Sequence, residues 1–262
     1  MNNKPIGIFD SGVGGTSIWK EINTLLPFED TIYLADSVNA PYGYKSVEEI
    51  ISLSIKNTEL LLKMGCKIIV VACNTATTNA ISVLRKKYDV PFIGIEPAIK
   101  SAALNSKSKS IGVLATKGTL TSCLFSKSTK EFTNNIQVLE VIGEGLVPLI
   151  EAGKIATEET TNLLNHFLQP MIVANIDHLV LGCSHYPYLI PQLKKLLPKH
   201  IKIIDSGEAV ARQTKHILQQ NKLLSGSTKT PNLQFFTNAS TKTLDFLLKS
   251  YAASISISKT KF

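Results

Sequence analysis

The chain has 262 residues, of which 44% are hydrophobic and 18% are charged. This balance is typical of a globular protein and excludes an intrinsically disordered chain, and the length fits one large or two small domains. Basic residues exceed acidic ones by 28 − 20 = +8, but the arginines are only Arg85 and Arg212. Because arginine is the usual reader of guanine edges, we interpret the charge as a solvated lysine-rich surface and expect no nucleic acid as partner.

The N-terminus, the apolar runs and the cysteines indicate in which compartment the protein functions. The N-terminus leads straight into a short apolar run without the features of a secretory signal, and the longest apolar runs, near 68–73 and 179–183, have the length of strands. The four cysteines contain no C-x-x-C pair, which argues against a disulfide scaffold or a zinc ribbon. We therefore expect a reduced, cytoplasmic protein with no membrane partner.

Short apolar runs alternate with amphipathic stretches along the chain, a pattern typical of a doubly wound α/β fold. Strands are predicted at residues 5–10, 31–35, 67–72, 92–95, 110–115, 136–142, 178–182, 201–205 and 233–237. The clearest helices are predicted at 47–64, 158–174 and 207–224. Ser46 and Glu49 form a capping-box pair at the start of the first helix, and Gly65 suits its end.

A glycine-rich segment, Asp10–Gly15, follows the first predicted strand and opens a helix. Its glycines permit close backbone approach, so its N–H groups are expected to face an anion. The segment lacks the G-x-G-x-x-G spacing and the lysine of nucleotide-binding loops. Since the Asp10 carboxylate would repel an anion, it is expected either to cap the helix or to serve a nearby thiol or ammonium group.

Two short segments recur in the same order. Residues 6–12 resemble 111–118, and residues 70–75 resemble 179–185. The spacing between the two elements is 63 residues in the first copy, from 10 to 73, and 68 in the second, from 115 to 183. Chance similarity of buried strands explains either match alone, but both together favour two homologous α/β halves.

The repeat predicts two pseudo-symmetric doubly wound α/β domains with the active site in the cleft between them. Crossing points near Glu96-Pro97 and Ser206-Gly207 give a discontinuous first domain, 1–97 with 207–262, and a second domain, 98–206. No linker rich in proline, glycine or serine separates the halves, so a tight interface is expected.

Cys73 and Cys183 occupy matched positions, each at the end of a predicted strand and before small polar residues. Ligands of open α/β sheets bind at the carboxyl ends of strands, where backbone N–H groups and a helix dipole stabilise a thiolate and lower its pKa. Cys66 and Cys123 lack this setting and are interpreted as packing residues, Cys123 in mid-helix.

His185 lies two residues after Cys183, close enough to orient the thiol or supply a proton. The other histidines stand in helical or surface contexts and are interpreted as inert: His166, His178, His200 and His216. A zinc site would need distant partners for Cys183 and His185, so no metal is expected. Tyr42 and Gly43 lie in a polar loop suited to binding a ligand.

Two opposed thiols and no cofactor suit the inversion of a carbon stereocentre, in which one group removes a proton from one face and another returns a proton to the other. Fixed donors must stabilise the charge that develops on the flanking carboxylate. The pattern supplies Asn74, Thr75, Thr116 and Ser184 for this purpose.

Together these segments resemble the glutamate racemase family, in order and at the family's spacing. The segments that carry the resemblance are 10–15, 40–43, 71–76, 115–119, 181–187 and 204–207. The resemblance implies a cofactor-independent two-base racemase that interconverts L- and D-glutamate and supplies D-glutamate for bacterial peptidoglycan. It implies that Cys73 acts on D-glutamate and Cys183 on L-glutamate, with Asp10 and His185 as auxiliaries. The substrate contacts that it implies are Asp10, Ser11, Tyr42, Gly43, Asn74, Thr75, Ser184 and His185.

Some points stay open within this resemblance. Asp36 and Glu151 match family carboxylates without a defined role, and Ser184 stands where the family usually has threonine. The hydroxyl is kept, so activity is expected, with looser packing beside the second cysteine. The alternatives are an aspartate racemase of the same superfamily and a non-catalytic module that binds an anion or a partner. The sequence does not determine whether the protein is a homodimer.

Overall fold

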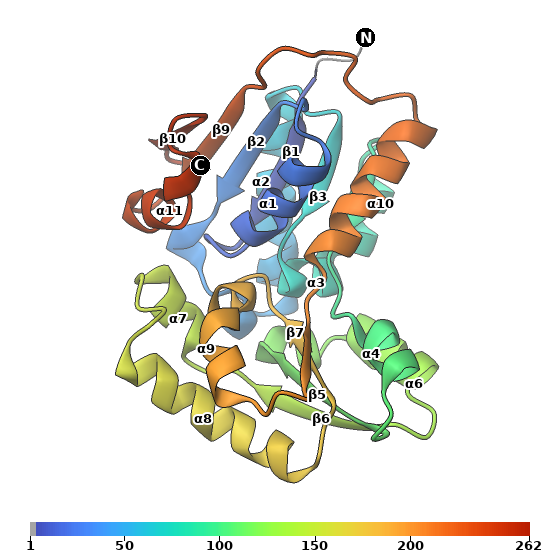
Figure 1. The fold of residues 1–262 in the computed structure, drawn as a ribbon. Coiled ribbons are helices and arrows are strands. Elements are labelled where there is room, and N and C mark those ends of the chain that lie inside the picture. The colour runs from blue at the N-terminus through green and yellow to red at the C-terminus, as the bar shows by residue number, and fades with distance from the viewer. Residues whose placement is uncertain (1–3) are drawn as a thin grey trace.

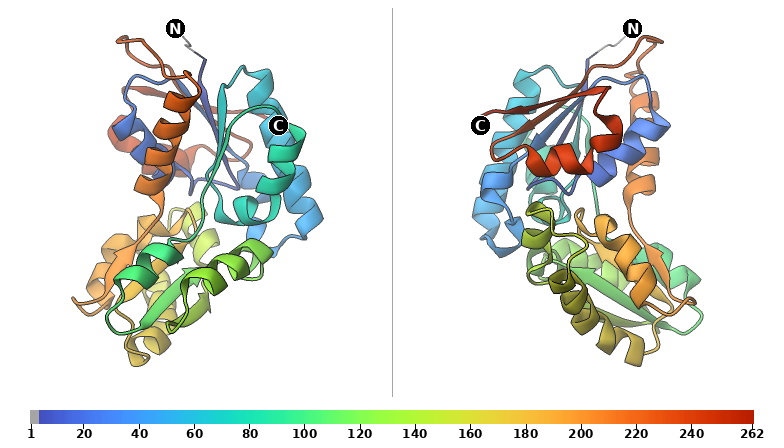
Figure 2. Two further views of the ribbon diagram at one scale, coloured as in Figure 1. Left: turned by 90° about the vertical axis from the view of Figure 1, so that its right-hand side faces the viewer. Right: turned by 60° about the vertical axis from the view of Figure 1, so that its left-hand side comes forward.

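The computed structural model describes residues 4–262, and its strands form two separate parallel sheets, one above the other in Figure 1. The larger sheet has six strands in the order β10-β9-β2-β1-β3-β4, and the smaller has four in the order β6-β5-β7-β8. Helices cover both faces of each sheet (Figures 1 and 2). The predicted fold class, two doubly wound α/β units, is confirmed.

The strand bounds lie close to those predicted. The larger sheet consists of β1 (Ile6–Asp10), β2 (Thr31–Ala35), β3 (Ile68–Val71), β4 (Phe92–Gly94), β9 (Leu233–Thr237) and β10 (Ile255–Lys259). The smaller sheet consists of β5 (Ser110–Ala115), β6 (Gln137–Ile142), β7 (His178–Gly182) and β8 (Lys202–Ile204). Strands β1, β3, β5 and β7 are buried along their whole length, as expected for the central strands of a parallel sheet.

The helices divide between the two faces of each sheet. The larger sheet packs on one face against α1 (Thr16–Leu25), α10 (Gly207–Gln220) and α11 (Lys242–Leu247), and on the other against α2 (Val47–Lys63) and α3 (Asn74–Lys87). The smaller sheet packs on one face against α7 (Leu146–Glu151), α8 (Glu158–Val173) and α9 (Ile190–Leu196), and on the other against α4 (Ile99–Asn105) and α6 (Cys123–Phe132). Short helical segments complete the set: η1 (Ser37–Asn39), η2 (Tyr42–Tyr44), α5 (Lys117–Leu120), η3 (Tyr186–Leu189) and η4 (Lys249–Tyr251).

The two sheets share one strand order, which agrees with the internal repeat. In each, the first strand lies between the second and the third, and the fourth follows the third: β2-β1-β3-β4 and β6-β5-β7-β8. Phe9 of β1 pairs with Val71 of β3, and Ala115 of β5 pairs with Gly182 of β7. A sheet of this order has its topological switch point between the first and third strands, where ligands bind. Cys73 and Cys183 each follow the third strand of their sheet.

The chain crosses between the two units twice. It leaves the larger sheet after β4 and returns after β8, and Figure 2 shows α10 and the C-terminal elements beside the strands of the first 95 residues. The Ser206 hydroxyl donates to the Glu96 carbonyl at 2.5 Å and joins the two crossing segments. One apolar cluster continues from the larger sheet into the smaller, so the interface is tight, as expected. The exact domain boundaries stay a prediction.

Local sequence explains several helix bounds. At the start of α2, the Ser46 side chain accepts from the Glu49 N–H, and the Glu49 carboxylate accepts from the Ser46 N–H, which is the predicted capping box. Gly65, after the helix, has a φ of +83°, a conformation that favours glycine. Helix α10 ends at Gln220, four residues before the predicted 224. Strand β10 was not predicted.

Two predictions about single residues are wrong. Cys123 is exposed and begins α6, with Ser122 capping the helix, so it is neither in mid-helix nor a packing residue. His178 is buried in β7, and its Nδ1 lies 2.7 Å from the Asp177 carboxylate. That carboxylate also accepts from the N–H groups of Lys107 and Ser108, so His178 belongs to a structural joint between β7 and the start of β5.

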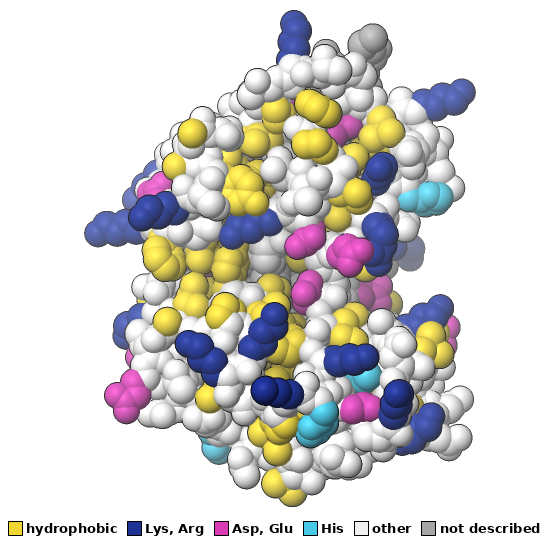
Figure 3. Space-filling model, in the orientation of Figure 1, with side chains coloured by type: hydrophobic (Ala, Val, Ile, Leu, Met, Phe, Trp, Pro, Cys, Tyr) yellow, Lys and Arg dark blue, Asp and Glu magenta, His cyan; other side chains and the backbone are white. Residues whose placement is uncertain are grey.

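The surface agrees with the charge expected from the sequence. Figure 3 shows Lys and Arg side chains spread over both units of the visible face and mixed with acidic ones. Among residues 4–262, no helix has the length and apolar character needed to cross a membrane.

Candidate active site

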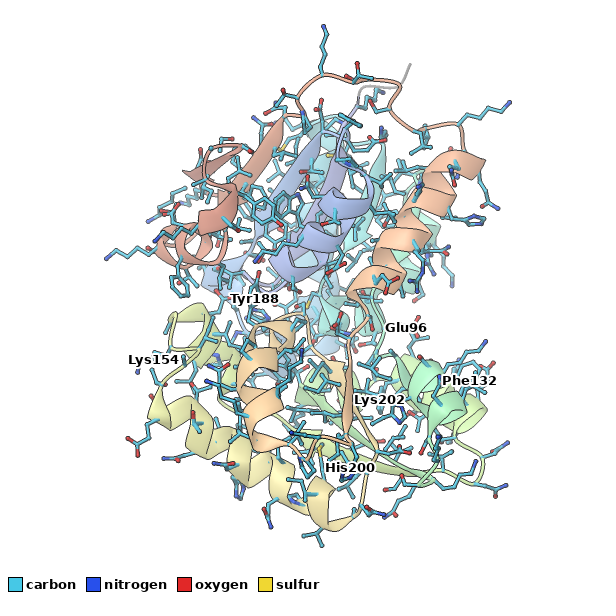
Figure 4. All side chains as sticks on the ribbon, in the orientation of Figure 1. Glu96, Phe132, Lys154, Tyr188, His200 and Lys202 are labelled. Atoms are coloured by element: carbon cyan, nitrogen blue, oxygen red, sulfur yellow. The ribbon has the colours of Figure 1, made fainter. Side chains whose placement is uncertain are left out.

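The polar ends of the two sheets face each other. Asp10 ends β1, Cys73 follows β3, and Cys183 follows β7, and each of these side chains is buried. Several hydrogen bonds join the two units here, among them Ser184 Oγ to Asp10 Oδ2 at 2.9 Å, Thr75 Oγ1 to Thr116 Oγ1 at 2.8 Å, and Ser17 Oγ to the Ser184 carbonyl at 2.8 Å. Beside them, the hydroxyls of Thr16 and Tyr188 lie 2.6 Å apart, and Figure 4 labels Tyr188 at this level.

Cys73 caps the N-terminus of α3. The Ala76 N–H donates to its sulfur at 3.4 Å, and the Ser11 hydroxyl lies 3.7 Å from it. These contacts lower the pKa of the thiol, as the sequence analysis expected, but burial and the Asp10 charge outweigh them. The pKa of Cys73 is therefore raised, and the expected low value is wrong for the site without substrate. The nearby Cys183 adds to this rise, so the two sulfurs share one electrostatic environment.

Cys183 has a different local setting, because its strand leads into a turn and the short helix η3. Pro187 and Pro191 lie in this stretch, which has no long helix like α3. His185 Nδ1 lies 3.8 Å from the Cys183 sulfur, and His185 Nε2 lies 2.6 Å from Glu151 Oε1. The Cys183 thiol, the His185 imidazole and the Glu151 carboxylate thus lie in contact one after the other.

The charge on His185 follows from these neighbours. Burial alone would lower the pKa of the imidazole, but the hydrogen bonds to Cys183 and Glu151, together with the negative charge of Asp10, raise it well above its usual value. Cys183 is therefore the thiol with a built-in cationic neighbour, whereas Cys73 lies near the Asp10 carboxylate.

The glycine-rich loop between β1 and α1 receives side chains from the other unit. A Cβ atom at Gly14 would lie 2.2 Å from His185 Nδ1, and one at Gly12 would lie 1.9 Å from Glu151 Oε1. The Val13 N–H donates to Glu151 Oε1 at 2.7 Å. The anion at this loop is thus a carboxylate of the protein itself, and glycine is required because His185 and Glu151 approach the backbone so closely.

Asp10 lies between the two cysteine sites. Its carboxylate accepts from the Ser11 N–H at 2.6 Å, from the Ser11 hydroxyl at 3.1 Å, from the Ser184 hydroxyl and from the Gly15 N–H. Burial raises the pKa of this carboxyl, against the opposing effects of the His185 charge and the Ser184 hydrogen bond. Ser184 thus uses the hydroxyl that it shares with threonine.

Donors for a bound anion lie beside Cys73. Asn74 is 2% exposed, and neither polar atom of its side chain has a hydrogen-bond partner among residues 4–262. A buried amide without partners is costly, so it indicates a place where a ligand supplies them. Thr75, Thr116 and Thr119 form a triangle of hydroxyls, with oxygens 2.8 to 3.3 Å apart, beside this amide.

Tyr42 and Gly43 lie in the loop after β2, as predicted. The Tyr42 hydroxyl donates to Asp36 Oδ2 at 2.5 Å and accepts from the Asn57 amide at 3.1 Å. Gly43 packs against Thr116, because a Cβ atom there would lie 3.0 Å from the Thr116 Cβ. Asp36, whose role the sequence left open, anchors this loop.

A comparison with known proteins identifies the family. The family model described as Asp/Glu/Hydantoin racemase matches residues 6–214. The chain belongs to the Asp/Glu/hydantoin racemase family. It is therefore an amino-acid racemase, and the predicted resemblance to glutamate racemases is confirmed by its relatives.

Among these relatives, the glutamate racemase of Herpetosiphon aurantiacus is 41% identical over 91% of this chain and 94% of its own. The crystal structure of glutamate racemase isoform RacE1 from Bacillus anthracis has a TM-score of 0.89 at 32% identity and covers 100% of this chain and 99% of its own. The Escherichia coli glutamate racemase, solved in complex with L-glutamate and the activator UDP-MurNAc-Ala, has a TM-score of 0.86 at 32% identity, with 98% of each chain covered.

Some contacts of the site were missed by sequence reasoning. The partnership of Glu151 with His185 joins residues 34 positions apart, and that with Val13 joins residues 138 positions apart, and no local pattern marks either. Asn238 also reaches Asp36, from a strand end that carried no motif. Among residues 4–262, no three histidine, cysteine, aspartate or glutamate side chains gather as a metal site would require.

We expect Glu151→Gln to lower kcat by about 10- to 100-fold, less than the ~10²–10⁴ supplied by a group that transfers the proton itself. The variant keeps the shape of the side chain and an oxygen for the Val13 N–H, but it removes the negative charge that holds the imidazolium. Initial rates of racemisation measure the effect. An unchanged kcat would contradict the role of Glu151.

Urea unfolding at several pH values gives a matched check on the same variant. Because the pKa of His185 is raised in the folded state, its contribution to stability is fully present below the usual histidine pKa of about 6.5 and is lost as pH rises through the raised value. The stability gap between the native chain and Glu151→Gln should therefore be widest near the low end of this window. A gap that is constant with pH would show that the charge of His185 is not involved.

Proposed function

We propose that the chain interconverts L- and D-glutamate by a two-base mechanism in which Cys183 acts on L-glutamate and Cys73 on D-glutamate. The choice of glutamate follows the relatives: curated glutamate racemases are 39 to 46% identical to this chain, and the Escherichia coli glutamate racemase, at 32% identity, was solved with L-glutamate bound. The observation that supports two bases is the matched place of the two cysteines, each after the third strand of its own sheet, within electrostatic reach of each other.

The proposed chemistry in the direction from L to D begins with the Cys183 thiolate. It removes the proton from Cα, and the electron pair of the broken C–H bond moves toward the substrate carboxylate. The Cys73 thiol then gives its proton to the opposite face of Cα. The step ends with a thiol at Cys183 and a thiolate at Cys73, so atoms and charge balance.

The starting protonation states agree with the neighbours of each sulfur. The raised pKa of Cys73 keeps it a thiol, which is the form that must donate, and the His185 imidazole lies beside the sulfur of Cys183, the group proposed to remove the proton. The α-ammonium group of the amino acid would lie near the Asp10 carboxylate and offset the charge that raises the pKa of Cys73. In the reverse direction, this compensation helps Cys73 to become the base.

The substrate carboxylates need fixed donors. The Asn74 amide, without partners among residues 4–262, and the hydroxyls of Thr75 and Thr116 are proposed to supply them. The hydroxyls of Ser11 and Ser184 already donate to Asp10. The Tyr42 hydroxyl is already bonded to Asp36 and Asn57, so the contribution of Tyr42 and Gly43 is assigned to the backbone of their loop.

The wider setting is part of the proposal. The enzyme is proposed to need no cofactor, to work in the cytoplasm and to supply D-glutamate for peptidoglycan, in keeping with the family. The family is one of racemases and the relatives are glutamate racemases, which excludes the alternative of a non-catalytic module.

A chiral assay tests the proposed function. Purified protein without added cofactor is incubated with L-glutamate, D-glutamate, L-aspartate or D-aspartate, and both enantiomers are quantified by chiral chromatography. We expect both glutamate enantiomers to reach a mixture of equal parts, with aspartate converted far more slowly. Preferred conversion of aspartate, or a requirement for pyridoxal phosphate or metal after dialysis against chelator, would overturn the proposal.

A further inference from the structure

One more strand of the larger sheet ends in a polar residue at the level of the site. The parallel register pairs Asp10 with Ala35 and Ala35 with Thr237, so Asp36 of the β2 end and Asn238 of the β9 end stand side by side at the same sheet edge. In a parallel sheet, this carboxyl edge is where ligands bind. Asn238 lies outside the matched residues 6–214, and nothing in the proposed mechanism uses it.

Asn238 fastens the start of the Tyr42 loop at two points. Its side-chain oxygen accepts from the Val38 N–H at 2.9 Å, and its side-chain nitrogen donates to Asp36 Oδ1 at 2.5 Å. The other oxygen of Asp36 holds the Tyr42 hydroxyl. Asp36 is fully buried. A hydrogen bond to its carboxylate that is lost is therefore not replaced by one to water.

The segment that follows Asn238 also contacts the Cys183 side of the site. The Thr243 hydroxyl, in α11, donates to the Glu151 carbonyl at the end of α7 at 2.7 Å. The Glu151 side chain in turn holds His185 and accepts from the Ser37 hydroxyl at 3.0 Å. Residues 238–243 therefore contact two acidic residues of the site. These are Asp36, on the Cys73 side, and Glu151, on the Cys183 side.

We propose that residues 238–243 act as a clamp, in which Asn238 and Thr243 are positioning residues that fix the Tyr42 loop and the Glu151–His185 pair. The proposal rests on the proposed racemase function. Asn238 acts through Asp36 on the loop that packs Gly43 against Thr116, so its loss should weaken substrate binding. Thr243 acts through Glu151 on His185, so its loss should slow proton transfer. We refer to Asn238 with Asp36 as the first arm of the clamp and to Thr243 with Glu151 as the second arm. Loss of the first arm is thus expected to change KM, and loss of the second to change kcat.

The first arm is tested with Asn238→Ala. We expect KM for both glutamate enantiomers to rise about tenfold, the size expected for one lost hydrogen bond to a charged group, while kcat changes little. Ser240→Ala is the matched control, because Ser240 is exposed in the same turn and its hydroxyl accepts only from the Lys242 N–H of its own segment. Should Asn238→Ala not fold, Asn238→Ser gives the same comparison.

A double-mutant cycle separates positioning from a general structural role. If Asn238 acts through Asp36, Asn238→Ala should have little further effect on KM in an Asp36→Ala background, because the shared partner is already gone. Additive effects in the cycle, or a loss of kcat with an unchanged KM, would overturn the first arm.

The second arm is tested with Thr243→Val, which keeps the shape and removes the hydroxyl. We expect kcat to fall several-fold with KM unchanged, and we expect no further fall in a Glu151→Gln background. An unchanged kcat, or a rise in KM, would overturn this arm. Native-chain activity on glutamate is measured first: its absence would refute the proposed function, whereas an active native chain with kinetically silent Asn238 and Thr243 variants would refute the clamp alone.

Discussion

Cys73→Ala and Cys183→Ala should each lower racemisation by about 10²- to 10⁴-fold, the range expected when a group that transfers a proton is removed. In a two-base mechanism each thiol serves one face of Cα, and neither reaches the other face. Alanine leaves no acid or base at that position. Chiral chromatography of both enantiomers, started from each in turn, measures the loss.

The other two cysteines are the matched controls. Cys66 is buried against Gly7, where burial raises its pKa to about 12, so it is an inert packing group, and Cys123 is exposed at the start of α6. Cys66→Ala and Cys123→Ala should keep nearly full activity, with a small loss of stability for Cys66→Ala only. If Cys73→Ala or Cys183→Ala folds normally and remains active, the two-base assignment is wrong.

Much of the fold could be predicted from local sequence, because a doubly wound sheet repeats simple units. Apolar runs gave all the strands of the smaller sheet and five of the six strands of the larger one. The missing strand, β10, lies at the sheet edge and has half-buried Ile255 and Ile257 alternating with exposed serines. This alternation is typical of a half-buried strand, but it is not a continuous apolar run like those of the inner strands, and apolar runs alone therefore miss it.

His178 shows a second limit of local reasoning. It opens the predicted strand 178–182, but its interpretation as a histidine in a helical or surface context does not account for its burial beside the Asp177 carboxylate. A histidine at the start of a central strand is tolerated because a tertiary partner satisfies it, and tertiary partners are not visible in one sequence.

The candidate site, like the fold, could be predicted from the sequence only in part. Strand-end positions marked Asp10, Cys73 and Cys183, because parallel topology forces such residues to one edge. The role of the glycines between β1 and α1 was not predicted. They make room for His185 and Glu151, which approach from the other unit. Such approach depends on how the two units pack, and neither composition nor periodicity reports it.

The origin of the proton in the product gives the sharpest test of the mechanism. In the proposed mechanism, the proton that Cys183 removes from L-glutamate stays on Cys183, and the proton that forms D-glutamate comes from Cys73. Thiol protons exchange with water between turnovers, so in deuterated water the delivered atom is deuterium. We expect early D-glutamate to carry about one deuterium at Cα while the remaining L-glutamate stays largely protiated, as separate acid and base groups require.

Mass spectrometry of both enantiomers, separated early in the reaction, makes this measurement, and D-glutamate as the starting material gives the mirror experiment. A single base that reached both faces would carry the original proton across and leave protium in the product. The structure argues against such a base, because each sulfur has its own fixed partners, Ala76 and Ser11 for Cys73 and His185 for Cys183. Substantial protium at Cα of the product would therefore mean that one thiol does all the proton transfer and that the other is a bystander.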